Sequence, residues 1–86
     1  MGSTECTIEM EVRNQPGVLV RVAHVFARRG CNIRSLHVEP HTDEQWSTMT
    51  IVVLSVPQIE QISQQLQKLV DVANVKTRSS MELSKK

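Results

Sequence analysis

Residues 5–33 read ECTIEMEVRNQPGVLVRVAHVFARRGCNI, and the hydrophobic pattern of this stretch changes its period at a short polar turn. Between residues 5 and 13, apolar and polar side chains alternate, which is the pattern of a half-buried strand. After the turn, apolar side chains recur at helical spacing, at Leu19, Val22, Ala23 and Phe26. Two arginines and Gly30 then supply cations and a cap for a helix end. The stretch predicts a strand over 5–13 and a helix over 17–29.

The remaining elements follow in the order strand, strand, helix, strand. We expect strands over 32–39, 46–56 and 72–77, with a polar turn over 40–45. The parity of the apolar residues changes within the first of these strands, which predicts a bulge or a late strand start near Ser35. A second helix is expected to start around residues 55–58, where Ser55 precedes Gln58 by three positions and Pro57 lies between them. Residues 78–86 are polar without a period, so we expect a frayed tail.

The order βαββαβ indicates an α+β, ferredoxin-like fold with a four-stranded antiparallel sheet and two helices on one face. With 86 residues the chain forms one domain, which we place at 5–78, with a flexible N-terminus over 1–4 and a flexible tail over 79–86. The strand over 46–56 is apolar on both faces. An apolar surface of that kind on a small domain favours self-association, by edge pairing or by sheet stacking.

Composition and spacing argue against several classes of function. A net charge of +1 gives no field that would attract nucleic acid or an anionic membrane, and one Trp, one Phe and no Tyr leave few rings for stacking on RNA bases. The longest apolar runs are too short for a spanning helix. Cys6 and Cys31 lack C-x-x-C spacing and fit core thiols of a cytoplasmic protein. No metal site is predicted, because the three histidines lack metal-ligand spacing, and no nucleophile motif nominates a catalytic residue.

The turn Asn14-Gln15-Pro16-Gly17 is the one motif that suggests a ligand. A helix that starts there presents the backbone N–H groups of Gly17, Val18 and Leu19 at the positive end of its dipole, where a carboxylate fits. Asn14 offers a donor and an acceptor, so it suits either end of an amino acid. On physical grounds alone, the same four residues also make a good turn and helix cap, and both interpretations stay open.

Several segments together resemble a known family. The stretches are 14–19 (NQPGVL), 26–33 (FARRGCNI), 35–38 (SLHV), 47–51 (STMTI) and 64–72 (QQLQKLVDV). They are similar to the ACT domain of the small, regulatory subunit of acetohydroxyacid synthase, also called acetolactate synthase. The resemblance covers residues 5–77. Many members of that family carry a second domain after the ACT domain.

The resemblance implies a non-catalytic subunit in branched-chain amino acid biosynthesis. Such subunits activate a catalytic large subunit and mediate feedback inhibition by valine or a related amino acid such as isoleucine. No cofactor is expected in this chain, whereas thiamine diphosphate, Mg and FAD are expected in the catalytic partner. ACT domains pair as homodimers with the ligand at the interface. By position, Asn14, Gly17, Val18 and Leu19 of one chain and Asn32 and Ile33 of the other would form the pocket. A free-standing amino-acid-sensing ACT protein that regulates transcription or another enzyme is the alternative.

Overall fold

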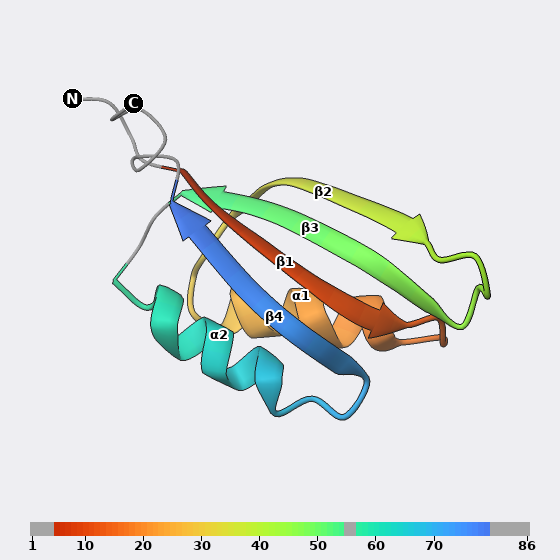
Figure 1. Cartoon of the computed structure of the whole chain (residues 1–86). Helices are drawn as coiled ribbons and strands as arrows, with labels where there is room; N and C mark the ends of the chain where they lie inside the picture. Colours follow the sequence, from red (N-terminus) through yellow and green to blue (C-terminus); the bar gives the residue numbers. More distant parts are fainter. Residues whose placement is uncertain (1–4, 55–56, 80–86) are drawn as a thin grey trace, which may run out of the picture.

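The structure is a computed structural model, and it describes residues 5–54 and 57–79. Six elements follow one another in the order βαββαβ (Figure 1). They are β1 (Glu5–Arg13), α1 (Val18–Arg28), β2 (Ile33–Pro40), β3 (Trp46–Leu54), α2 (Ile59–Gln67) and β4 (Val72–Ser79).

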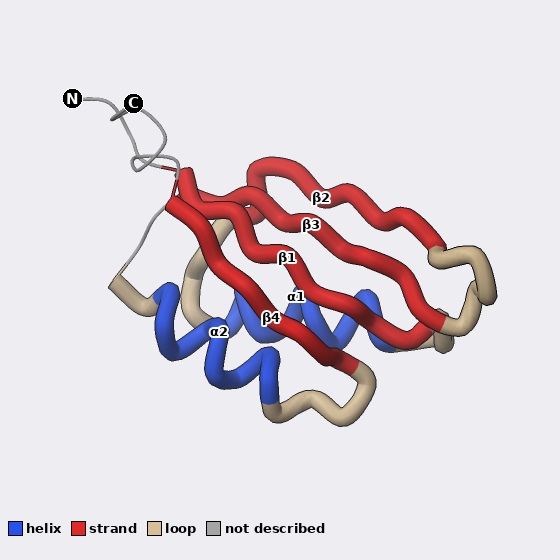
Figure 2. The backbone as a smooth tube through the Cα atoms, in the orientation of Figure 1, coloured by secondary structure: helices blue, strands red, loops and turns tan. Residues whose placement is uncertain are grey.

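The four strands form one antiparallel sheet in the order β2-β3-β1-β4. Both helices lie on the same side of this sheet, so the fold has two layers (Figure 2). The predicted ferredoxin-like α+β architecture is therefore confirmed. Since β1 and β3 are the central strands, the helices bury one face of both, and β2 and β4 form the two edges.

The alternation in the first strand sets the core as predicted. Every second side chain of β1 is buried, from Cys6 to Val12, and the intervening residues lie on the open face. The same alternation runs along β3. Phe26 of α1 is fully buried between the layers and is the largest residue of the core. The sheet and the helices therefore share one apolar interior, as expected for a domain of this size.

Helix α1 buries a slightly different stripe from the predicted one. Val18, Val22 and Phe26 are buried, whereas Leu19 is 46% exposed. The predicted stripe that began at Leu19 is thus wrong by one position at the first turn. The predicted glycine cap is confirmed. Gly30 has φ +67° and donates its N–H to Ala27 O at 3.0 Å, while the N–H of Cys31 reaches Phe26 O at 3.0 Å, which is the Schellman arrangement.

Several element boundaries differ from the sequence prediction, most clearly those of α2 and β4. Helix α2 begins at Ile59, with Gln58 at its N-cap position and no side-chain cap bond there. Ser55, the predicted cap, lies outside the described residues, as does Val56 at the predicted end of the third strand. Strand β4 continues through Arg78 and Ser79, which pair with Thr7 and Cys6 of β1. The prediction that the frayed tail starts at Arg78 is therefore wrong, because ladder pairing extends β4; residues 80–86 lie outside the described range.

Strand β2 is an edge strand that no helix covers (Figure 1). Its register shifts between Ile33 and Ser35, which confirms the predicted bulge. Leu36 and Val38 pair with the buried residues Ile51 and Met49 of β3, so they point to the helix side of the sheet. Both are nevertheless 39% exposed. The edge of the molecule next to α1 thus keeps an apolar surface.

The two thiols are buried inside this fold, which leads to a prediction about alkaline stability. Burial raises the pKa of Cys6 and of Cys31 above the ordinary thiol value of 9.0. Well below pH 9 both states hold these protons, so the contribution to stability is fully present. Above pH 9 the unfolded chain releases them first, and we expect the free energy of unfolding to fall as the pH rises through the folded-state pKa values.

Urea unfolding between pH 7 and pH 10.5 measures this decline. The double variant Cys6→Ala/Cys31→Ala is the control, because it keeps every other titrating group. Its free energy of unfolding should fall less steeply above pH 9 than that of the unchanged chain. Parallel curves for the two proteins would contradict the prediction.

Candidate functional site

Three loops meet at one end of the sheet, next to the start of α1 (Figure 1). The backbone N–H of Asn14, just after β1, donates to Gln45 O of the β2–β3 loop at 2.9 Å. The N–H of Arg13 donates to Asp71 O of the α2–β4 turn, also at 2.9 Å. The predicted ligand-binding turn is therefore held from both sides by segments distant in the sequence.

The side chain of Asn14 is part of this loop junction. Its Nδ2 donates to Glu44 O at 2.7 Å and makes a longer contact with Trp46 O at 3.5 Å. Its Oδ1 accepts a hydrogen bond from the hydroxyl of Ser47. The amide thus ties the turn after β1 to the start of β3, a role that the sequence does not reveal.

The start of α1 keeps free backbone donors, though not the three predicted ones. Gly17 lies at the N-cap with φ +88°, which favours glycine. The N–H of Val18 donates to Gln15 O at 3.3 Å, so the prediction that Val18 offers an unpaired N–H is wrong. Within the described ranges, the N–H groups of Gly17, Leu19 and Val20 donate to no other group of the chain. The hydrogen bond from Val18 to Gln15 therefore occupies one donor, and the other N–H groups of the first helical turn stay available to an anion.

Cationic side chains surround the same turn. Arg21 forms an ion pair with Asp71, with 2.6 Å between Nη2 and Oδ2, and Asp71 is only 16% exposed. Arg13 approaches the same carboxylate at 3.8 Å and lies over the ring of Trp46, 4.9 Å from its centroid. A side chain at position 17 would place its Cβ 3.7 Å from the guanidinium of Arg21. Asp71 therefore holds two cations beside the helix start and fixes the geometry of the turn.

An open, mostly apolar depression of about 270 Å³ adjoins the turn. Its apolar lining comes from four elements, β1, α1, β2 and β3, and consists of Val12, Val18, Leu19, Val38 and Met49, with Arg13, Asn14 and Gln15 beside them. The exposure of Leu19 and Val38 is explained by this depression. Its size suits the side chain of a small amino acid.

The structure brings only part of the predicted site together in one chain. Asn14, Gly17, Val18 and Leu19 lie around the start of α1. Ile33 pairs with Val53, which pairs with Cys6 near the beginning of β1. Since Asn14 follows the other end of β1, Asn32 and Ile33 lie about 20 Å or more from it along the strand. Any contribution of these two residues to the site must come from another copy of the chain.

Sequence reasoning missed Ser47, whose side chain is buried with 1% exposure and bonds to Asn14. A signal for it was present in the sequence. Ser47 has the same parity as Met49, Ile51 and Val53, the buried residues of β3. A serine at a core position of a strand needs a hydrogen-bond partner, and the nearest polar turn supplied one.

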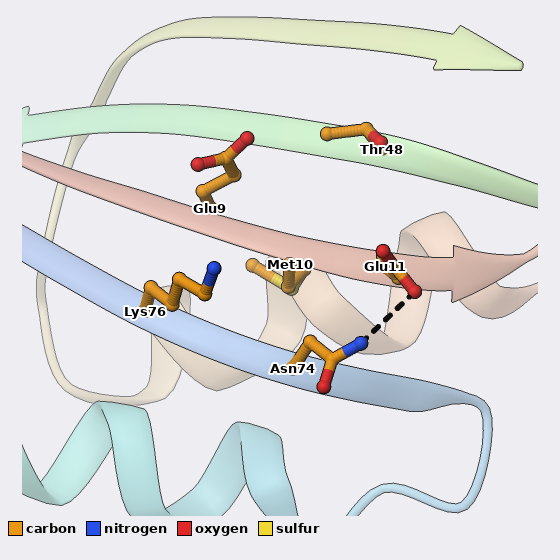
Figure 3. Close-up of a pocket in the computed structure, with 6 residues that line it drawn as sticks. All are labelled: Glu9, Met10, Glu11, Thr48, Asn74 and Lys76. Carbon is orange, nitrogen blue, oxygen red and sulfur yellow. Dashed lines mark hydrogen bonds between the residues drawn. The ribbon is translucent and has the colours of Figure 1, made fainter. Parts of the chain in front are cut away.

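A second depression, of about 260 Å³, lies on the open face of the sheet (Figure 3). It is formed mainly by polar side chains, and Asn74 Nδ2 donates to Glu11 Oε1 there at 3.1 Å. Asn74 has φ +54° at the register shift of β4 against β1, which accounts for the irregular surface. Within residues 5–54 and 57–79, no buried polar side-chain atom lacks a hydrogen-bond partner.

The described residues form neither a metal-binding cluster nor a membrane-spanning helix. No group of three or more His, Cys, Asp or Glu side chains there could hold a metal ion. None of the helices in that part of the chain has the length and apolar character needed to cross a membrane.

The fold and the loop junction define the class of the protein as an ACT-type domain. Several solved structures share this fold, among them an ACT domain protein from Streptococcus pneumoniae, with a TM-score of 0.74 and 16% identity over 95% of this chain and 96% of that one. At that identity the likeness shows the fold alone.

Sequence comparison then gives the family. Residues 8–74 match the AHAS small subunit-like ACT domain, and the chain belongs to this family. The acetolactate synthase small subunit of Mycolicibacterium smegmatis is 43% identical over 75 residues, which are 86% of this chain and 44% of that protein. The corresponding Haemophilus influenzae protein is 44% identical over 72 residues, 83% of this chain and 44% of its own length.

A solved structure supports the same assignment. The crystal structure of the acetolactate synthase small subunit from Thermotoga maritima has a TM-score of 0.73 and 42% identity, over 85% of this chain and 46% of that one. The chain spans about half the length of the relatives it matches. The recognised family and its ACT fold are therefore confirmed.

Proposed function

We propose that the chain is the amino-acid-binding part of a non-catalytic regulatory subunit of acetolactate synthase. It would bind valine or a related branched-chain amino acid and change the activity of a catalytic large subunit. The observation that carries the proposal is the apolar depression beside free backbone donors at the start of α1. Family membership supports the regulatory role.

The three parts of an α-amino acid each find a matching group here. The carboxylate suits the N–H groups of Gly17 and Leu19, where the helix dipole is positive and Arg21 adds charge. The ammonium suits the oxygen of the Asn14 amide. A branched aliphatic side chain suits the depression lined by Val18 and Leu19.

A homodimer would complete the site. Antiparallel pairing of β2 with β2 of a second copy, about a two-fold axis through the middle of the strand, sets Ile33 of the partner subunit opposite Pro40. Asn32 of the partner subunit would then approach the β2–β3 loop, which already contacts Asn14. The uncovered, apolar β2 edge supports this arrangement. Such a dimer would bring Asn32 and Ile33 of the partner subunit close to the turn at Asn14, although the two segments lie far apart within one chain.

Regulation would then follow from linkage between two binding events. An amino acid that binds one state of the dimer more tightly shifts the population toward that state and changes its effect on the catalytic subunit. Thiamine diphosphate, Mg and FAD would belong to the catalytic subunit, as would the chemistry. This chain would act only by binding the amino acid and the catalytic subunit.

Calorimetric titration of valine, leucine and isoleucine, with and without the catalytic subunit, tests the proposal. We expect binding of at least one of them and a parallel change in acetolactate synthesis. Binding without any effect on synthesis would favour a free-standing amino-acid sensor. Absence of binding in both settings would refute the sensor role.

Asn14→Ala is expected to weaken amino acid binding by about 1–3 kcal/mol, the scale of a hydrogen bond to a charged group, or about 5- to 150-fold. The variant removes the acceptor for the ammonium and releases the turn from Glu44 and Ser47. The same titration measures the loss. Gln64→Ala, which removes an exposed amide on α2, is the matched control and should bind as the unchanged chain does. Equal affinities of Asn14→Ala and the control would place the ligand elsewhere.

A further inference from the structure

Ser47 carries a hydroxyl group in an otherwise apolar part of β3, and it contacts Asn14 of the candidate site. It is 1% exposed, and the residues of the same parity along β3 are Met49, Ile51 and Val53, all buried. A buried hydroxyl without a partner is costly, so its hydrogen bond fixes the neighbouring group as much as it satisfies the serine. That neighbouring group is Oδ1 of Asn14.

The surrounding groups allow one orientation of the Asn14 amide. Its nitrogen faces two carbonyl oxygens, those of Glu44 and Trp46, and carbonyl oxygens only accept hydrogen bonds. The amide nitrogen must therefore lie on that side. Its oxygen then lies toward Ser47, which must donate. If the amide were turned over, its oxygen would face two carbonyl oxygens, and both hydrogen bonds to Glu44 O and Trp46 O would be lost.

This orientation decides which capacity of Asn14 remains for a ligand. The amide nitrogen is directed at Glu44 O and Trp46 O, while Oδ1 has accepted one hydrogen bond and can accept a second. Asn14 thus offers an acceptor. An acceptor suits an ammonium group and repels a carboxylate, which is left to the donors at the start of α1.

We propose that Ser47 is a positioning residue of the amino acid site. By donating to Asn14 Oδ1, Ser47 holds the amide so that the amide oxygen accepts a hydrogen bond from the ammonium of the ligand. This contact sets the direction in which the amino acid binds. This inference rests on the proposed function, since it assigns a role within the same site. It adds that the site selects amino acids over acids without an ammonium.

Two ligands and three variants test the proposal by calorimetry. The ligands are valine and 2-hydroxy-3-methylbutanoate, in which a hydroxyl replaces the ammonium. Ser47→Ala should weaken valine binding by about five- to tenfold, the scale of one hydrogen bond, and should narrow the preference for valine over the hydroxy acid. Ser47→Thr keeps the donor and should retain affinity within about twofold. Ile62→Val, a core change in α2 that costs comparable stability, should leave both affinities unchanged.

The side-chain amide of Asn14 gives a second readout that needs no ligand. In ¹⁵N-edited NMR spectra of the free chain, Ser47→Ala should shift the two Nδ2 proton resonances of Asn14 and speed their exchange with water, and Ser47→Thr should restore both. Unchanged Asn14 resonances in Ser47→Ala, or unchanged valine affinity in that variant, would overturn the proposal. If the unchanged chain binds no amino acid, the proposed function is refuted, and the amide spectra still decide whether Ser47 positions Asn14.

Discussion

Replacing Phe26 with alanine is expected to lower the free energy of unfolding by about 3–5 kcal/mol. Phe26 is fully buried between the sheet and the helices, and it is the one phenylalanine of the chain. No other ring can move in, because the chain has no tyrosine and its one tryptophan is held over Arg13 at the end of the sheet. Small domains have total stabilities of about 5–15 kcal/mol, so a loss of this size leaves much of the protein unfolded under mild denaturing conditions.

Urea unfolding followed by circular dichroism measures the effect. Val20→Ala in the same helix is the control, since Val20 is 62% exposed and its truncation should change the free energy by less than about 0.5 kcal/mol. A graded variant, Phe26→Leu, should fall between the two because it leaves a smaller cavity. Similar stabilities of Phe26→Ala and Val20→Ala would show that the core is assembled differently.

Leu36→Arg should convert the proposed dimer into a monomer. Leu36 lies near the middle of β2, where a two-fold axis would pass, and it is 39% exposed in the single chain. A guanidinium at the centre of an apolar interface should raise the dissociation constant by at least about thirtyfold, or about 2 kcal/mol. Sedimentation across a range of protein concentrations measures the shift. If half of the ligand site comes from the partner subunit, valine affinity should fall together with dimerisation.

The opposite edge of the sheet supplies the control for that experiment. Thr77 of β4 is an exposed edge residue on the same face as Leu36. Thr77→Arg adds the same charge at a place where no pairing is proposed, so its sedimentation should match that of the unchanged chain. A dimer that survives Leu36→Arg but dissociates in Thr77→Arg would move the interface to β4.

Local sequence patterns predicted most of the fold because the responsible interactions are themselves local. The alternation of β1, the glycine cap at Gly30 and the bulge near Ser35 each depend on neighbours a few positions away. The end of β4 was missed because Arg78 and Ser79 are held by pairing with β1, more than seventy positions earlier in the chain. A polar sequence does not reveal that pairing.

The candidate site was predicted in part for the same reason. Asn14, Pro16 and Gly17 are residue types that favour turns and helix starts, and the structure places them before α1. The contacts that fix it are non-local: Ser47 and Glu44 reach Asn14 across about thirty positions, and Asp71 reaches Arg13 and Arg21 from the far side. Their presence depends on strand register and on the rotation of α1. The one-position error at Leu19 has the same origin, because only the assembled layers decide which side of a helix is covered.

The two edges of the sheet differ in a way that limits how copies can add to one another. The β4 edge is interrupted by a register shift near Asn74, whose backbone is left-handed, and it carries the exposed cations Lys76 and Arg78. These features obstruct the addition of a further strand. The β2 edge lacks such cations beyond its bulge, from Ser35 to Pro40. In the proposed dimer, pairing through β2 would use up the one unobstructed edge in a single step, so the sheet would end as a closed pair rather than grow into a fibril.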